Sequence, residues 1–440
     1  MNSMSCYESM DYILKKYPKA YSQVSVYHEE NMYIMWSDTG KSTKHSITDS
    51  VNYYAYNGIW ENYNFSDLED LNLYLKRNRN TGKEGSFQSY DKNLREENLL
   101  KHFNMSDVRA ETCRLFDYLI EEFNDDELKL SFSAKAKNIS ELTLNSENSL
   151  KHNRYFDISA AAQVTYNQVK SMLLFYRQNG LLSFDEVYDS INRHAQYLKK
   201  CSGQVSCDSA AMVFDEELSA FFFHEVVGHL MEAELSDLNN NTFYNYLGRK
   251  LSVPQLSIYD NGNFSPHGMA MVFDDEGIKY RNTELISNGT INRMLFSRNC
   301  SMQIDEQPTG NGRRSSFYNR PRTRMTNIVV SEGDTDIHDL IAGIENGFFC
   351  VGCNSASSSL QMFSLFPREV YLVENGRITE PLLPVAVRGN PVDALDSIIG
   401  IGNKSRTYNV FCRKYAEQPL YMTAASPAVA LRNLNIRRLY

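Results

Sequence analysis

The alternation of apolar and polar residues near the start of the chain predicts a helix followed by a sheet. Residues 7–17 have the apolar spacing of a short helix, and residues 23–28 alternate like a half-buried strand. Two further β-rich segments, 31–36 and 50–60, contain or border the turn sequences Asp-Thr-Gly and Asn-Gly. We therefore expect an antiparallel meander.

Helical spacing dominates the next part of the chain. The apolar intervals predict four helices, at residues 68–75, 107–123, 164–182 and 184–200. Polar joints of low hydrophobicity lie near 77–95 and 137–154. Residues 1–204 are therefore predicted to form an N-terminal α+β domain with a mixed α/β sheet, which a joint near 77–95 would divide into two subdomains.

The rest of the chain alternates short β-rich segments with glycine turns. Asn-Gly, Glu-Gly-Asp and Glu-Asn-Gly sequences occur among the segments 269–273, 327–330 and 369–373. We expect a largely antiparallel β domain over residues 205–440 that also carries a helix with candidate metal ligands. The predicted fold class of the whole chain is α+β.

Composition and charge narrow the function classes. The 440 residues are 42% hydrophobic and 22% charged, which is typical of a folded chain. A net charge of −9 disfavours a phosphate-neutralising surface, so we expect no nucleic-acid partner. The N-terminal sequence lacks a signal-peptide pattern, and apolar runs stop short of the ~20 residues that span a bilayer. We expect no membrane partner, a cytoplasmic location, and reduced thiols for the eight cysteines.

One apolar segment carries most of the candidate chemistry, because it contains His224, Glu225 and His229. In the H-E-x-x-H pattern the two histidines are four residues apart on one helix face, where both bind one zinc ion. Here they are five apart, which separates them by about 140° around a regular helix. Both can reach one ion only if the helix is distorted by a π-type widening or a kink, for which Gly228 is the natural position. The spacing leaves a second interpretation open, namely two unrelated histidines on a buried helix.

The wider sequence favours the metal interpretation. The segment His224-Glu225-x-x-x-His229-x-x-Glu232 resembles the H-E-x-x-x-H signature of the TldD/PmbA family of metallopeptidases. The likeness covers residues 205–440 and is only an outline before them. Other segments resemble successive blocks of that family in the same order, at residues 273–277, 308–314, 321–327, 369–378 and 411–414.

The resemblance implies a zinc centre and a catalytic base. The family's third ligand is a cysteine near the C-terminus, whose position here is Cys412, and residues 426–432 fit the same context. His224, His229 and Cys412 would hold Zn²⁺ and leave a fourth tetrahedral position for water. Glu225 would accept the proton of that water as general base.

The resemblance also implies a zinc-dependent metallopeptidase that hydrolyses extended or unfolded peptides. The substrate would bind as an added β-strand in a tunnel between subunits, with low sequence specificity. The implied roles are leader-peptide removal and degradation of small proteins, in a homodimer or in a heterodimer with a TldE-like subunit. Two alternatives stay open: a non-catalytic scaffold subunit of such a complex, and a hydrolase of a non-peptide amide.

Two charged groups near the motif have paired interpretations. Glu232 would accept a hydrogen bond from His229, one turn earlier, or would be a solvated carboxylate on the helix surface. Arg313 and Arg314 follow a glycine turn, and they would either bind an anion such as a substrate carboxylate or be solvated.

The remaining candidates are expected to be structural. Cys350 and Cys353 have metal or redox spacing, but a lone pair of this kind is expected to be two buried thiols. The chain departs from the family pattern at 351–359, where a glycine-rich segment is usual, and at 422–425, where glycines are usual. Neither change affects a proposed ligand, but both would reshape the cleft. Surface or capped side chains are expected at the other histidines, including His194, His267 and His338.

Overall fold

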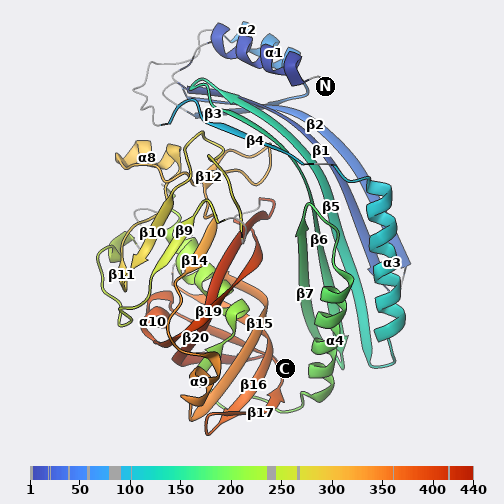
Figure 1. Cartoon of the computed structure of the whole chain (residues 1–440), viewed down its shortest axis with the longest axis vertical. Coiled ribbons are helices and arrows are strands. Elements are labelled where there is room, and N and C mark those ends of the chain that lie inside the picture. Colours follow the sequence, from blue (N-terminus) through green and yellow to red (C-terminus); the bar gives the residue numbers. More distant parts are fainter. Residues whose placement is uncertain are drawn as a thin grey trace.

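The structure is a computed structural model that contains two large β-sheets, one from each half of the chain (Figure 1). The expected turns at 38–39 and 57–59, most of the joint near 77–95, and His267 lie outside the described residues. The described residues are 3–17, 19, 21–37, 40–56, 60–78, 91–100, 102–234, 244–264, 268–359, 361–414 and 417–439.

The first sheet contains seven strands in the order β3-β2-β1-β5-β6-β4, with β7 also paired to β6. Its pairs are antiparallel except that of β4 with β6. The predicted meander is confirmed, although segments 23–28 and 31–36 form one long strand. The strands are β1 (Tyr21–Ser37), β2 (Gly40–Tyr56), β3 (Trp60–Phe65), β4 (Arg95–Leu99), β5 (Leu128–Asn145), β6 (Leu150–Tyr166) and β7 (Val169–Gln178).

Four helices accompany this sheet, and they confirm the predictions for 7–17, 68–75, 107–123 and 184–200. Helices α3 and α4 pack on the sheet, where Phe116 of α3 stacks on Phe132 of β5 with ring centroids 4.4 Å apart. Side-chain oxygens of Asn104 and Ser183 cap their first turns. The helices are α1 (Ser3–Lys16), α2 (Leu68–Arg77), α3 (Met105–Phe123) and α4 (Phe184–Lys200).

The helix predicted at 164–182 is wrong, since this segment contains the end of β6 and all of β7. Asn167 and Gln168 both have positive φ, of 45° and 73°, and they make the tight turn between the two strands. In β7, buried Ser171 and Leu173 alternate with exposed Lys170 and Leu174, which is a strand period. Short apolar runs fit both periods, and here pairing with β6 decides for the strand.

The joint predicted at 137–154 is also wrong. These residues belong to the β5–β6 hairpin, whose two strands pair from Leu128 with Tyr166 to Leu144 with Leu150. Polar residues of this hairpin lie within the pairing ladder and not in a linker; Lys137, for example, pairs with Asp157 on the other strand. A long strand with one polar face therefore has the same low hydrophobicity as a linker.

The second sheet contains eleven strands in the order β11-β10-β9-β14-β20-β18-β16-β15-β8, with β17 beside β16 and β19 beside β20. Most pairs are antiparallel, and β14–β20 and β15–β8 are parallel. A separate two-stranded sheet pairs β12 (Gly312–Arg313) with β13 (Arg322–Thr323). The strands are β8 (Ser209–Phe214), β9 (Ile258–Asn261), β10 (Asn282–Ser287), β11 (Thr290–Ile291), β14 (Asn327–Val330), β15 (Asn346–Ser358), β16 (Phe363–Glu374), β17 (Arg377–Leu382), β18 (Val385–Gly389), β19 (Ile398–Cys412) and β20 (Leu420–Arg438).

This half confirms the predicted α+β class, and strands occur as expected at 327–330 and 369–373. Segment 269–273 is an exception, because it makes only the isolated bridges Asn263–Ala270 and Phe273–Lys279. The helical elements are α5 (Glu216–Phe223), the π-helix η1 (His224–Gly228), α6 (His229–Met231), the 3₁₀-helix η2 (Tyr244–Tyr246), α8 (Arg298–Ile304), α9 (Ile337–Ala342) and α10 (Pro391–Asp396).

The two halves are joined by a buried polar contact. Tyr54 on β2 donates a hydrogen bond to the Glu276 carboxylate at 3.0 Å, and Arg298 on α8 forms a buried 2.6 Å ion pair with Glu147. Glu147 lies in the turn between β5 and β6, so the second half contacts the first sheet at that turn. We retain a domain boundary between residues 204 and 205 as a proposal.

Candidate metal centre

The segment with the two histidines is a helix that changes type. Asp215 caps α5 by accepting a 2.8 Å hydrogen bond from the Leu218 backbone N–H. The helix widens to the π form at His224–Gly228, where the His229 backbone N–H donates to the His224 carbonyl five residues earlier. The imidazole centroids are 4.8 Å apart as a result. The predicted π-type distortion is confirmed.

Gly228 is required here by close packing. Its backbone is ordinary right-handed helix, with φ −52° and ψ −59°. A Cβ at this position would lie 2.5 Å from the Met325 sulfur and 3.3 Å from a side-chain carbon of Ile328 on β14. The glycine therefore lets the helix approach β14 closely.

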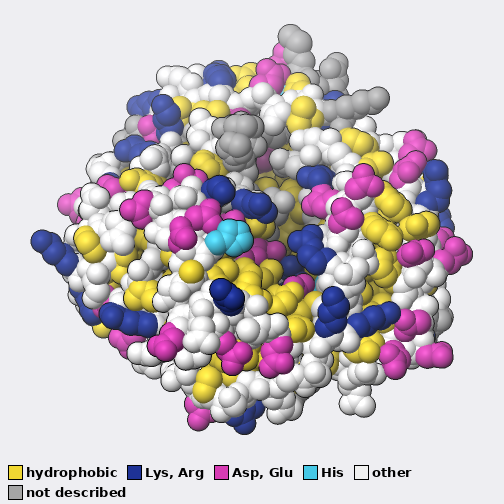
Figure 2. Space-filling view, turned by 60° about the horizontal axis from the view of Figure 1, so that its bottom comes forward, with side chains coloured by type: hydrophobic (Ala, Val, Ile, Leu, Met, Phe, Trp, Pro, Cys, Tyr) yellow, Lys and Arg dark blue, Asp and Glu magenta, His cyan; other side chains and the backbone are white. Residues whose placement is uncertain are grey.

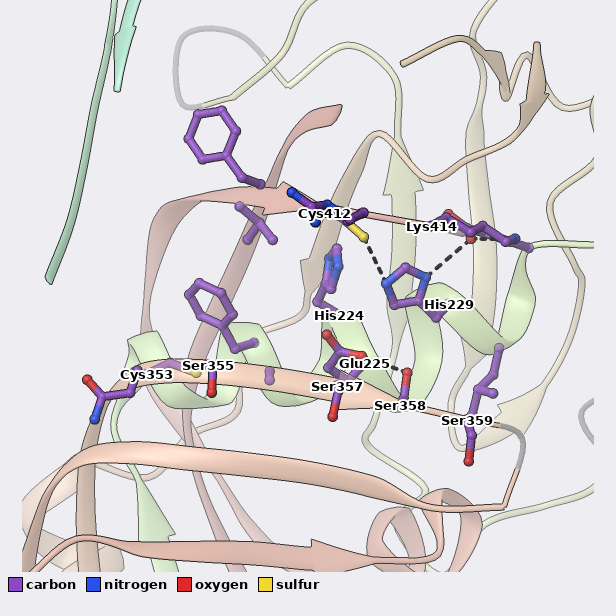
Figure 3. Close-up of a pocket in the computed structure, with 18 of the residues that line it drawn as sticks. His224, Glu225, His229, Cys353, Ser355, Ser357, Ser358, Ser359, Cys412 and Lys414 are labelled. Atoms are coloured by element: carbon purple, nitrogen blue, oxygen red, sulfur yellow. Dashed lines mark hydrogen bonds and ion pairs between the residues drawn. The ribbon is translucent and has the colours of Figure 1, made fainter. Parts of the chain in front are cut away.

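The third predicted residue, Cys412, lies beside the histidines although it is 183 positions from His229 (Figure 3). It is the last residue of β19, and its Sγ lies 2.9 Å from His229 Nε2. One potential ligand atom from each of His224, His229 and Cys412 lies within 4.8 Å of the other two. Among the described residues, no other group of three such side chains meets the same condition.

The environment of His224 suits a metal ligand. The side chain is buried, with 1% of the residue exposed, and neither ring nitrogen has a hydrogen-bond partner among the described residues. Burying a nitrogen without a hydrogen-bond partner costs free energy, so a bound ligand is expected at such nitrogens. Burial and the neighbouring His229 hold the pKa of His224 well below its usual value. The imidazole is therefore neutral, which is the form that binds metals.

Glu232 orients the second histidine. Its carboxylate lies 3.3 Å from His229 Nδ1, as predicted, and the ring's other nitrogen faces Cys412. It also accepts from Lys414 at 2.8 Å and from the Met325 backbone at 3.0 Å. Burial raises the pKa of Glu232, but Lys414 and His229 outweigh burial and hold it well below its usual value. The alternative of a solvated surface carboxylate is wrong, since Glu232 is fully buried.

The pKa of His229 depends on burial and on its neighbours Cys412 and Glu232. Burial lowers the pKa of His229, while the charges of Cys412 and Glu232 and the hydrogen bonds to them raise it well above its usual value. The Cys412 sulfur and the Glu232 carboxylate therefore favour a positive charge at the position of the His229 ring. A metal cation bound there would meet the same two groups.

Glu225 faces the same space from the neighbouring helix position. Its carboxylate accepts a 2.6 Å hydrogen bond from the Ser358 hydroxyl on β15 (Figure 3). Ser358 belongs to segment 351–359, which departs from the family pattern. No sequence pattern assigned a role to this serine, because only the fold brings positions 133 apart into contact.

These residues line a cavity of about 550 Å³. Its walls are the π-helix, the last residues of β15 and β19, and Leu174 of β7, so both halves of the chain contribute. On the face shown in Figure 2, hydrophobic side chains are exposed around a central hollow, with basic side chains near it. The lining residues are Leu174, Phe221, His224, Glu225, His229, Leu230, Glu232, 353–359, Val410, Phe411, Cys412, Arg413 and Lys414.

Arg313 and Arg314 lie outside this lining, and the solvated interpretation is wrong because both are buried. Arg313 donates to the backbone carbonyls of Met325 and Tyr421 at 2.7 and 2.8 Å. Arg314 donates to the Asn52 side chain at 2.7 Å. Their guanidinium groups therefore stabilise the packing of the segments that they contact.

The other candidates take structural positions. Cys350 and Cys353 are buried thiols, as expected, and burial raises the pKa of each. His194 is buried and capped by Glu369, with Nδ1 3.2 Å from its carboxylate. His338 is exposed on the surface, as expected.

Comparison with known proteins identifies the family of the second half of the chain. The family model for the PmbA/TldA metallopeptidase C-terminal domain matches residues 208–438, which is more than half of the chain. The matched segment thus belongs to a class of metallopeptidase-like domains. The chain is a member of the TldD/PmbA family.

Curated relatives match the same half. A metalloprotease of Synechocystis is 30% identical over 226 residues, covering 51% of this chain and 49% of the relative. A zinc metalloprotease TldD homolog of Saccharolobus solfataricus is 29% identical over 227 residues, covering 51% of each chain. The chain thus spans about half the length of the curated relatives it matches.

Solved structures match the whole chain. TldE from Thermococcus kodakarensis has a TM-score of 0.73 and 14% identity, covering 98% of this chain and 100% of that one. A putative modulator of a DNA gyrase from Thermotoga maritima has a TM-score of 0.75 and 17% identity, covering 99% and 100%. At these identities the likeness shows the fold.

Proposed function

We propose that this protein is a zinc-dependent metallopeptidase that hydrolyses peptide bonds in extended or unfolded peptides. The observation that carries the proposal is the meeting of His224, His229 and Cys412 beside the carboxylate of Glu225 in one cavity. The zinc named for the Saccharolobus relative supports the choice of metal. Residues 205–440 would form the metallopeptidase domain.

The donor set fits zinc. Two imidazole nitrogens and one thiolate are ligands that zinc prefers, and three protein ligands are typical of catalytic sites. The described part of the chain offers no hydrogen-bond partner to the ring nitrogens of His224, and Glu232 fixes the ring of His229. When bound, the ion would act as a Lewis acid and make a water molecule more acidic.

Glu225 would move the proton. Its carboxylate is next in sequence to one ligand and faces the cavity, so it would accept a proton from water and return it to the leaving amine. Ser358 holds one carboxylate oxygen at 2.6 Å and leaves the other oxygen for this exchange. A general base of this kind contributes about 10²–10⁴-fold to the rate.

A free stretch of strand edge supports an extended substrate. β15 pairs with β16 along almost its whole length, whereas its pairing with β8 ends at Cys350. Just beyond it, the backbone N–H groups of Gly352 and Cys353 donate to the carboxylates of Asp215 and Glu217. From Cys353 to Ser358 the strand lines the cavity, and no other described strand pairs with that edge. An extended peptide could pair there as an added strand, through main-chain hydrogen bonds that depend little on side chains.

The assembly and the setting remain part of the proposal. We expect a homodimer or a heterodimer with a TldE-like subunit, leader-peptide removal or small-protein degradation as the role, and a cytoplasmic location. Within the described part of the chain, no helix combines the length and the apolar character needed to cross a membrane.

The decisive experiment compares Glu225→Gln with the wild type. The variant should keep stoichiometric zinc, measured by mass spectrometry of the metal, and lose about 100-fold or more in turnover of an unstructured fluorogenic peptide. Wild-type turnover in Glu225→Gln would contradict the role of the base. A zinc-containing wild type that cleaves no peptide would favour the hydrolase of another amide.

Two cysteines in the same cavity give a matched control. Cys412→Ala should lose zinc, whereas Cys353→Ala, which also removes a buried thiol from the cavity wall, should keep it. A wild type without zinc would favour the non-catalytic scaffold subunit.

A further inference from the structure

The cavity has two ends of different character. In Figure 3 the β15 segment runs along it from Cys353 at one end to Ser359 at the other, with Glu225 between them and Lys414 on the Ser359 side. The polar groups that surround His229, including Glu232 and Lys414, thus lie away from the Cys353 end.

The first sheet closes the Cys353 end. Asn354, next to Cys353, accepts hydrogen bonds from the Ser171 hydroxyl at 2.9 Å and from the Met172 backbone N–H at 3.0 Å. Both donors are on β7, whose outer edge has no paired strand among those described. This contact fixes β7 against β15 at that end of the cavity.

Leu174 follows two residues later on the same face of β7 as Met172. Two residues further, Tyr176 makes an edge contact with the Phe411 ring of β19, at 5.1 Å between centroids. Leu174 therefore lies between a contact with β15 and a contact with β19. It lines the cavity and yet is 53% exposed.

Two aromatic side chains line the cavity with it. Phe411 is 38% exposed and directly precedes Cys412. Phe221 stands on α5 one helical turn before His224 and Glu225, and so on the same helix face. Large apolar side chains exposed on the wall of a concave site are typical of a binding surface.

We infer that Leu174, Phe221 and Phe411 form an apolar subsite that receives a large apolar side chain of the peptide, on the Cys353 side of the bond to be cleaved. The inference rests on the proposed function and adds to it one position of side-chain selectivity. The occupant is a substrate side chain because the subsite shares one cavity with Glu225 and with the free edge of β15.

The test uses unstructured peptides that differ at one position, with Phe or Ala scanned across the residues around the cut. For the wild type, kcat/KM should favour Phe over Ala by about tenfold or more at one position, which is the range for filling an apolar pocket. Leu174→Lys should reduce that ratio to below about threefold while the zinc content stays stoichiometric. Ile378→Ala, which alters a residue that is 46% exposed on β17 and outside the cavity, should keep the ratio.

A binding measurement separates this inference from the proposed function. In the Glu225→Gln background, fluorescence anisotropy should show tighter binding of the Phe peptide than of the Ala peptide, and Leu174→Lys should abolish the difference. That pattern without any wild-type hydrolysis would support the subsite and contradict the peptidase. Equal binding of both peptides would overturn the subsite. A changed oligomeric state in Leu174→Lys with the preference intact would also overturn it, since the apolar side chains would then form a subunit contact.

Discussion

At the scale of single residues, each side chain of the site is oriented by the groups that it contacts. His229 has a carboxylate at one nitrogen and the Cys412 sulfur at the other, and both nitrogens of His224 lack a partner within the described ranges. Glu225 has a single hydroxyl donor in Ser358. Contacts of this kind restrict the rotamers of reacting groups before a substrate arrives.

Ser358→Ala tests the positioning of Glu225. A hydrogen bond to a charged group contributes about 1.5–3 kcal/mol, so loss of this hydroxyl should lower kcat by at least about tenfold. The KM and the zinc content should change little, and Ser358→Thr should restore much of the rate.

Ser357→Ala is the matched control, because Ser357 lines the cavity beside it and makes no described hydrogen bond with Glu225. Steady-state kinetics of the three variants would settle the point. An unchanged kcat in Ser358→Ala would show that the contact has no role in the reaction.

At the scale of elements, the π-helix sets the ligand geometry. Its i→i+5 hydrogen bond aligns two residues that a regular helix would separate, and Gly228 lets it pack against β14. The metal centre is thus shaped by one local distortion and by the place where β19 ends.

Gly228→Ala should destabilise the protein by about 1–3 kcal/mol, the usual cost of overpacking, because the new methyl group meets Met325 and Ile328. We expect a lower denaturant midpoint and weaker zinc binding. Gly180→Ala serves as the control, since a Cβ there meets no atom within 4 Å. Equal midpoints for the two variants would mean that the helix can move away from β14 at no cost.

The sequence was informative where the determinant is local. The five-residue spacing of the histidines required a distortion, and the apolar intervals predicted α2, α3 and α4. It failed where contacts between segments decide, as in β7, which was predicted to be helical but pairs with β6.

The contact of Ser358 with Glu225 also depends on how separate segments pack. The pairing of β15 with β16 shifts between Cys353 and Ser355, and such a bulge re-aims the side chains that follow it. No pattern within segment 351–359 fixes which of its serines reaches Glu225.

At the scale of the whole molecule, the cavity needs both halves of the chain. Leu174 comes from the first sheet and the proposed ligands from the second. The buried contact of Arg298 with Glu147 and Tyr21 holds these halves together, with the guanidinium 4.5 Å from the Tyr21 ring centroid.

Glu147→Ala should therefore cost about 3–5 kcal/mol, because it leaves the buried guanidinium of Arg298 without its carboxylate. Limited proteolysis should cut the variant faster between the two halves. The exposed pair of Arg177 with Glu186 provides the control, and Glu186→Ala should change stability by less than about 1 kcal/mol. Similar proteolysis of both variants would show that the ion pair does not hold the halves together.

The central claim is that His224, His229 and Cys412 bind one zinc ion, and X-ray absorption at the zinc edge tests it most directly. The zinc-loaded protein should show one sulfur at about 2.3 Å and two imidazole nitrogens at about 2.0–2.1 Å. Cys412→Ala should lose bound zinc, and any zinc that it keeps at saturating metal should show no sulfur ligand, whereas Cys353→Ala should keep the sulfur signal. A wild-type spectrum without sulfur, or an unchanged sulfur signal in Cys412→Ala, would contradict the account.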